Sequence, residues 1–79
     1  MAKNHQDYKK FLEEQIEWCQ EQDLILEEIE SKLLEMKEIA EYALKRELTP
    51  SEAGKLNGQL NDLKSKIHSL EKKLHSDVH

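Results

Sequence analysis

The segment RELTPSEAGKL, residues 46–56, contains the only proline of the chain and one of its two glycines. Within it, Thr49-Pro50-Ser51-Glu52 has the order of a helix start. A threonine N-cap accepts from the backbone N–H three residues on, proline fits the first helical position, and a glutamate at the third completes a capping box. Proline also keeps the preceding residue out of helical geometry, so one helix must end near Glu47 and another must begin at Pro50. A turn over 48–50 is short enough to predict an antiparallel helical hairpin.

The residues after the turn carry a single apolar seam. Its members are spaced alternately by three and four, as in a coiled coil. They are Ala53, Leu56, Leu60, Leu63, Ile67, Leu70 and Leu74. This pattern predicts a helix over about 50–76, followed by a frayed tail at 77–79.

The residues before the turn carry a wider apolar stripe, which predicts a long helix over about 5–47. One row recurs every seven residues, and two further rows lie beside it. A stripe this wide faces more than one neighbour, as in a helical bundle. The rows are Leu12, Cys19, Leu26, Leu33 and Ala40; Tyr8, Gln15, Gln22, Ile29, Met36 and Ala43; and Phe11, Trp18, Ile25 and Ile39.

Folding the second helix back along the first leaves about residues 6–21 uncovered, roughly 24 Å of helix. The expected contacts pair Leu56 with Ala40, Leu60 with Met36, Leu63 with Leu33, Ile67 with Ile29, Leu70 with Leu26 and Leu74 with Gln22. The uncovered segment holds the only phenylalanine and the only tryptophan, and exposed apolar patches mark interfaces. The candidate contact residues are Tyr8, Phe11, Leu12, Trp18, Cys19 and Ile25.

Two structures would cover this segment. Two hairpins could form a homodimeric four-helix bundle, or the first helix could break near Gln20–Asp23 and fold back as a three-helix bundle. Because the seven-residue repeat continues through Gln20–Asp23 without glycine or proline, the dimer is favoured. The expected fold is all-α, with residues 1–79 forming one coiled-coil-like hairpin domain.

Composition narrows the functional classes. One cysteine among 79 residues leaves no internal disulfide and favours a reducing, cytoplasmic compartment. No apolar run approaches the length of a membrane span. The net charge of −5 argues against nucleic acid as a partner, since phosphates are bound by lysine and arginine.

The charges are unevenly placed along the chain. Residues 13–30 hold eight acids and no lysine or arginine. Residues 1–48 have 13 acids and 7 bases, a net charge of −6, whereas residues 49–79 have 4 acids and 5 bases, a net charge of +1. The acidic block is either a docking surface for a protein with a basic surface or a solvated helix face.

Catalytic, cofactor and metal sites are not expected. A hairpin offers little concave interior in which to tune a carboxylate. His75 and His79 are four residues apart, a spacing that allows two ligands on one helix face to bind a metal ion. They lie at the C-terminal end without a third ligand nearby in the sequence. A small-residue stripe on the second helix is a candidate second interface, where a backbone could approach closely. It consists of Gly54, Gly58, Asn61 and Ser65.

Residues 29–70 resemble the helical hairpin in the N-terminal region of bacterial flagellins. The first helix matches at Leu33, Met36, Glu38, Ile39, Ala40 and Ala43, and the second at Leu60, Leu63 and Ile67. The asparagine- and arginine-rich flanks of flagellins are absent, so the resemblance implies a helical packing surface and not a filament subunit. The expected function is a non-enzymatic protein–protein interaction module, an adaptor, regulator or inhibitor that self-associates. The alternative is a self-assembling structural protein.

Overall fold

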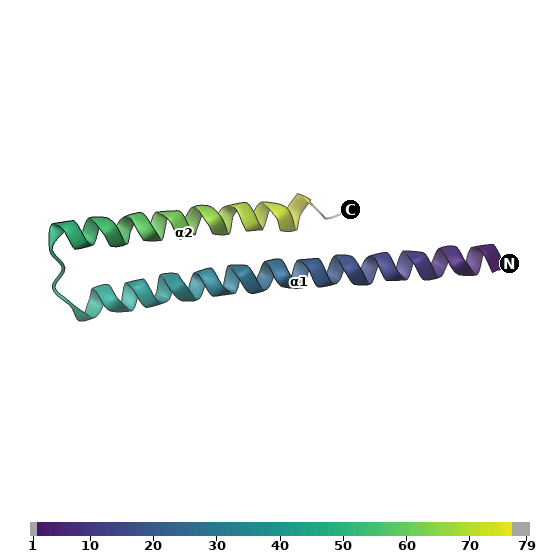
Figure 1. Ribbon diagram of the computed structural model, residues 1–79, viewed down its shortest axis with the longest axis horizontal. Coiled ribbons are helices and arrows are strands. Elements are labelled where there is room, and N and C mark those ends of the chain that lie inside the picture. The colour runs from purple at the N-terminus through teal and green to yellow at the C-terminus, as the bar shows by residue number, and fades with distance from the viewer. Residues whose placement is uncertain (1, 77–79) are drawn as a thin grey trace.

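The computed structural model is an antiparallel pair of helices (Figure 1). Helix α1 spans Ala2–Lys45 and helix α2 spans Pro50–Ser76. The structure describes the backbone of residues 2–76 and the side chains of residues 5–74, so the predicted tail at 77–79 lies outside it. The rod measures 71 × 19 × 11 Å. Its radius of gyration of 20.1 Å far exceeds the roughly 12 Å of a compact chain of this length.

The all-α hairpin predicted from the sequence is therefore confirmed. Helix α1 begins three residues before the expected position, at Ala2, and ends at Lys45 instead of Glu47. It runs without a break through Gln20–Asp23, so the first segment does not fold back as a third helix. Figure 1 shows the N-terminal part of α1 extending past the end of α2.

The turn has the predicted cap with one difference. The Glu52 backbone N–H donates to Thr49 Oγ1 at 3.2 Å, and the Ala53 N–H donates to the Thr49 carbonyl at 2.9 Å. The Glu52 carboxylate accepts from the Thr49 hydroxyl at 3.1 Å, whereas a full capping box would direct it to the Thr49 N–H. Thr49 thus connects the turn to the first turn of α2 by two side-chain hydrogen bonds.

Replacing Thr49 with alanine should lower the free energy of unfolding by about 1 kcal/mol, because an α2 backbone donor loses its acceptor. Thermal unfolding followed by circular dichroism measures the change. Ser51→Ala, at an exposed neighbouring position, is the matched control and should leave the melting temperature nearly unchanged. Equal effects of the two substitutions would show that the cap contributes nothing specific.

The interface between the helices uses a different α1 stripe from the expected one. The least exposed α1 positions are spaced by four and three, and they combine two of the three predicted rows. They are Trp18, Gln22, Ile25, Ile29, Lys32, Met36, Ile39 and Ala43. The row from Leu12 to Ala40 lies beside this seam, with Leu26 45% and Leu33 51% exposed. The expected pairing of Leu63 and Leu70 with Leu33 and Leu26 is therefore wrong.

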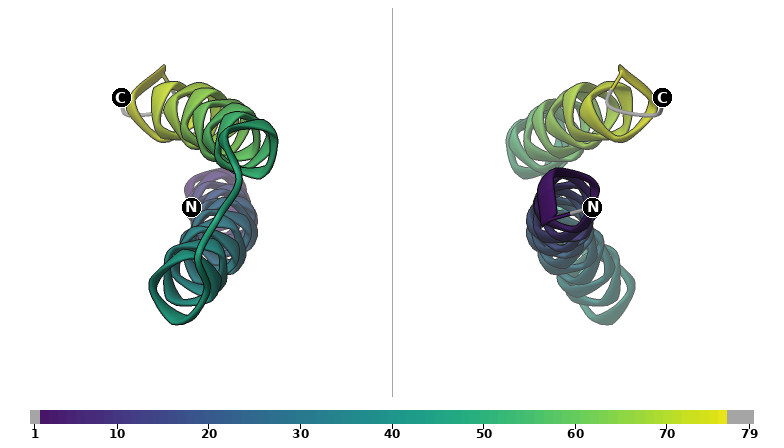
Figure 2. Two further views of the ribbon diagram at one scale, coloured as in Figure 1. Left: turned by 90° about the vertical axis from the view of Figure 1, so that its left-hand side faces the viewer. Right: turned by 90° about the vertical axis from the view of Figure 1, so that its right-hand side faces the viewer.

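On α2 the predicted seam is confirmed, except at the exposed Ala53. Leu63, Ile67 and Leu70 are buried, while Leu56 and Leu60 are half-buried. Figures 1 and 2 explain this gradient, because the two helices diverge towards the turn. None of the described large side chains is fully buried. The hairpin core is therefore small, and it lies in the C-terminal half of α2.

Candidate interaction surfaces

The N-terminal segment of α1 presents apolar side chains without cover from α2. This overhang, residues 5–17, includes Tyr8, Phe11, Leu12 and Ile16, which are 63%, 54%, 43% and 57% exposed. All four belong to one continuous helix, so their positions along it are fixed by the helical rise. Three of the predicted contact residues, Tyr8, Phe11 and Leu12, are thus exposed here together with Ile16.

A continuous apolar row follows the same helix beyond the overhang. We call Leu12, Cys19, Leu26 and Leu33 the flank row, because each lies beside the seam and they recur every seven residues. All four are exposed. Leu12, Ile16 and Cys19 also line a shallow hollow on α1. The flank row therefore joins the overhang to the side of the hairpin as one apolar face.

Two predicted contact residues lie elsewhere. Trp18 and Ile25 are half-buried and belong to the seam that faces α2. Gln22 lies between them and is only 8% exposed. The hydrophobic face available to a partner is therefore rotated from Trp18 and Ile25 towards Cys19 and Leu26.

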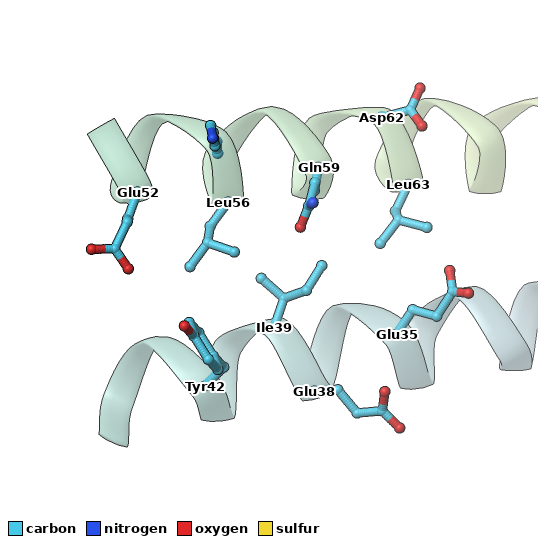
Figure 3. Close-up of a pocket in the computed structure, with 10 residues that line it drawn as sticks. Glu35, Glu38, Ile39, Tyr42, Glu52, Leu56, Gln59, Asp62 and Leu63 are labelled. Carbon is cyan, nitrogen blue, oxygen red and sulfur yellow. The ribbon is translucent and has the colours of Figure 1, made fainter. Parts of the chain in front are cut away.

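An open groove lies on the other side of the seam, where the helices diverge (Figure 3). It encloses about 630 Å³. Ile39, Leu56 and Leu63 point into it from the two helices. Its rim carries four acids and one base: Glu35, Glu38, Glu52, Asp62 and Lys55. Sequence reasoning missed this groove, because only the divergence of the helices opens it.

Tyr42, on the groove wall, is contacted by Arg46, the residue that follows α1. Arg46 Nη1 donates to the Tyr42 hydroxyl at 3.2 Å, and the guanidinium carbon lies 4.8 Å from the centroid of the Tyr42 ring. This cation–π contact orients Tyr42 along the groove wall. Tyr42 nevertheless remains 39% exposed.

The small-residue stripe of α2 lies away from α1. Gly54, Gly58, Asn61 and Ser65 are all exposed. A Cβ built on either glycine would meet no atom of the described residues within 4 Å. The candidate second interface is therefore an open face, and nothing in the single hairpin requires glycine there.

The described residues contain no cluster of three or more His, Cys, Asp or Glu side chains that could hold a metal ion. The pairing of His75 with His79 lies outside the described side chains. Among the described helices, none is both long and apolar enough to cross a membrane.

The fold and these surfaces define an elongated helical hairpin with an uncovered apolar helix face. No protein-family model, curated protein or solved structure shows significant similarity to the chain. The resemblance to the flagellin hairpin stays a prediction.

Proposed function

We propose that this protein is a non-enzymatic protein–protein interaction module that self-associates and binds other helices through the exposed face of α1. The observation that carries the proposal is the uncovered apolar face formed by the overhang and the flank row. A helix that is apolar on two adjacent sides requires two neighbours, and α2 provides only one.

The exposed area supports the same conclusion. The chain exposes 6858 Å², whereas a compact monomer of 9.3 kDa exposes about 5,000 Å². The surplus of about 1,900 Å² exceeds the roughly 800 Å² that each partner buries in a standard protein interface. Association is thus the physical route by which so small a core gains stability.

The acidic groove is the second face of the module, and its charge suits a basic helix. Ile39, Leu56 and Leu63 supply apolar contacts, and the carboxylates of the rim would pair with lysine or arginine. The exposed thiol of Cys19 fits a reducing compartment. The proposed roles are those of an adaptor, a regulator or an inhibitor.

Replacing Phe11 and Ile16 with glutamate tests the proposal. Both residues are more than half exposed in the hairpin, so the fold tolerates the change, while an interface that buries them does not. Light scattering after size-exclusion chromatography should show the native chain as an oligomer and the double variant as a monomer.

The matched control is Gln6→Glu with Ser31→Glu, which adds the same charge at exposed polar positions and should leave the native mass unchanged. A double variant that keeps the native oligomeric mass would refute the assignment of this face. Open-ended oligomers that grow with concentration would favour the self-assembling structural protein, with Gly54 and Gly58 in the contact.

A further inference from the structure

Building on the proposed function, we propose that the partner of the flank row is the flank row of a second copy, packed antiparallel. In this arrangement Leu12 of each copy lies opposite Leu33 of the other, and Cys19 lies opposite Leu26. The two-fold axis passes between Cys19 and Leu26. Each overhang then lies along the turn half of the other hairpin.

A second copy fits because both halves of α1 expose apolar side chains of the flank row. The overhang lacks a covering helix, and the side of α1 near the turn carries the exposed Leu26 and Leu33. An antiparallel pairing places the overhang of each copy against the side of α1 that carries Leu26 and Leu33 in the other copy. A parallel pairing would bring the two overhangs together beyond both α2 helices, where no third helix could cover them.

The seven-residue spacing restricts the register. A shift of one heptad in one direction places Cys19 against Cys19 and turns Leu33 towards His5. A shift in the other direction places Leu26 against Leu26 and turns Leu12 towards Ala40. Only the intermediate register gives each of the four flank-row residues a flank-row partner, and it overlaps nearly the full length of the two α1 helices.

Charge complementarity favours the same arrangement. Residues 12–23 of α1 hold five acids and no base, whereas the flank-row side of α2 carries Lys64. Figure 3 shows Tyr42 opposite Leu56 and Glu35 opposite Leu63 along the hairpin. Continuing this alignment brings Glu14 to within about one turn of Lys64 of the second copy. One carboxylate and one lysine of opposite charge then lie near each other.

The alternative position for the overhang is the groove on the other side of the seam. Its rim is formed by Glu35, Glu38, Glu52 and Asp62, with Lys55 as the single base. An overhang that carries Glu13, Glu14 and Glu17 would meet like charges there. On the flank-row side the residues of α2 that follow the buried leucines are Lys64 and Glu71, beside Asn57. The flank-row side is therefore the compatible one.

The arrangement has one like-charge contact. Asp23 of each copy approaches its counterpart near the axis, at an exposed position where water screens the repulsion. The resulting dimer has three helices in cross-section over most of its length, because each α2 covers only one half. This differs from a four-helix bundle, in which both α2 helices would run side by side.

Cysteine cross-linking determines the register. In the proposed dimer two Cys19 residues are offset by seven residues, or about 10.5 Å along the axis, so they cannot form a disulfide. A cysteine at position 26 lies directly opposite Cys19 of the other copy. Leu26→Cys, which retains Cys19, should therefore oxidise to a covalent dimer, whereas the native chain and Leu26→Cys with Cys19→Ser should not.

A second variant makes the test independent of Leu26. Leu12→Cys with Leu33→Cys, in a Cys19→Ser background, should also cross-link between copies. Cross-linking of the native chain, or of Leu26→Cys with Cys19→Ser, would overturn the register while leaving the proposed function intact. The absence of every cross-link in a chain that sediments as a dimer would also overturn it. A native chain that sediments as a monomer would refute the proposed self-association itself.

Discussion

Replacing Ile67 with aspartate should unfold the hairpin. Ile67 is 8% exposed and lies between Leu63 and Leu70, the two other buried apolar residues among the described side chains. The substitution removes an aliphatic side chain from this core and places a carboxylate between Leu63 and Leu70. The expected loss is about 4 kcal/mol, as much as a core of this size supplies.

Far-UV circular dichroism at room temperature measures the outcome, since almost all the native signal comes from α1 and α2. Ser69→Asp is the matched control, because it adds the same side chain to the same helix at an exposed position. It should cost only the difference in helix propensity, a few tenths of a kcal/mol. Native helicity in the Ile67 variant would show that the three buried residues are not the core.

Replacing Leu26 and Leu33 with glutamate should dissociate the dimer without removing the hairpin seam. Both leucines are exposed in the single hairpin, at 45% and 51%, so the change acts mainly on association. Each leucine is about half exposed, so burying the rest of it on binding contributes about 1 kcal/mol, and a two-fold dimer contains four such leucines. The dissociation constant should therefore rise by about 10³-fold.

Sedimentation equilibrium over a range of concentrations measures this shift. Glutamate retains a high helix propensity, which keeps the effect on the helix itself small. The Gln6→Glu and Ser31→Glu control should sediment like the native chain. If the leucine variant and the native chain have the same dissociation constant, the flank row does not form the interface.

The turn and the seam of α2 could be predicted from sequence because local chemistry determines them. Thr49 and Glu52 act within four residues of each other, and one row of leucines can face only one way. The α1 face could not be predicted in this way, because three apolar rows lie side by side and any adjacent pair can form a seam. The structure selects the pair that contains Trp18, Ile25 and Ile39, and it leaves Leu26 outside.

One part of the candidate site could be predicted from the sequence and the other could not. The overhang was predictable from the unequal lengths of the two helices. The acidic groove was not, because it depends on the divergence of α1 and α2 towards the turn (Figure 2). No periodicity in the sequence encodes that angle. The exposure of Leu33 likewise depends on which α1 rows α2 selects.

Hydrogen–deuterium exchange of the overhang in the purified chain tests the central claim most directly. A single uncovered helix of this length is marginal in water, so its amides exchange quickly unless another helix packs on it. At concentrations where the chain associates, residues 5–17 should be protected to an extent similar to residues 25–36. Exchange of residues 5–17 as fast as in an unfolded peptide, while residues 25–36 stay protected, would contradict the account.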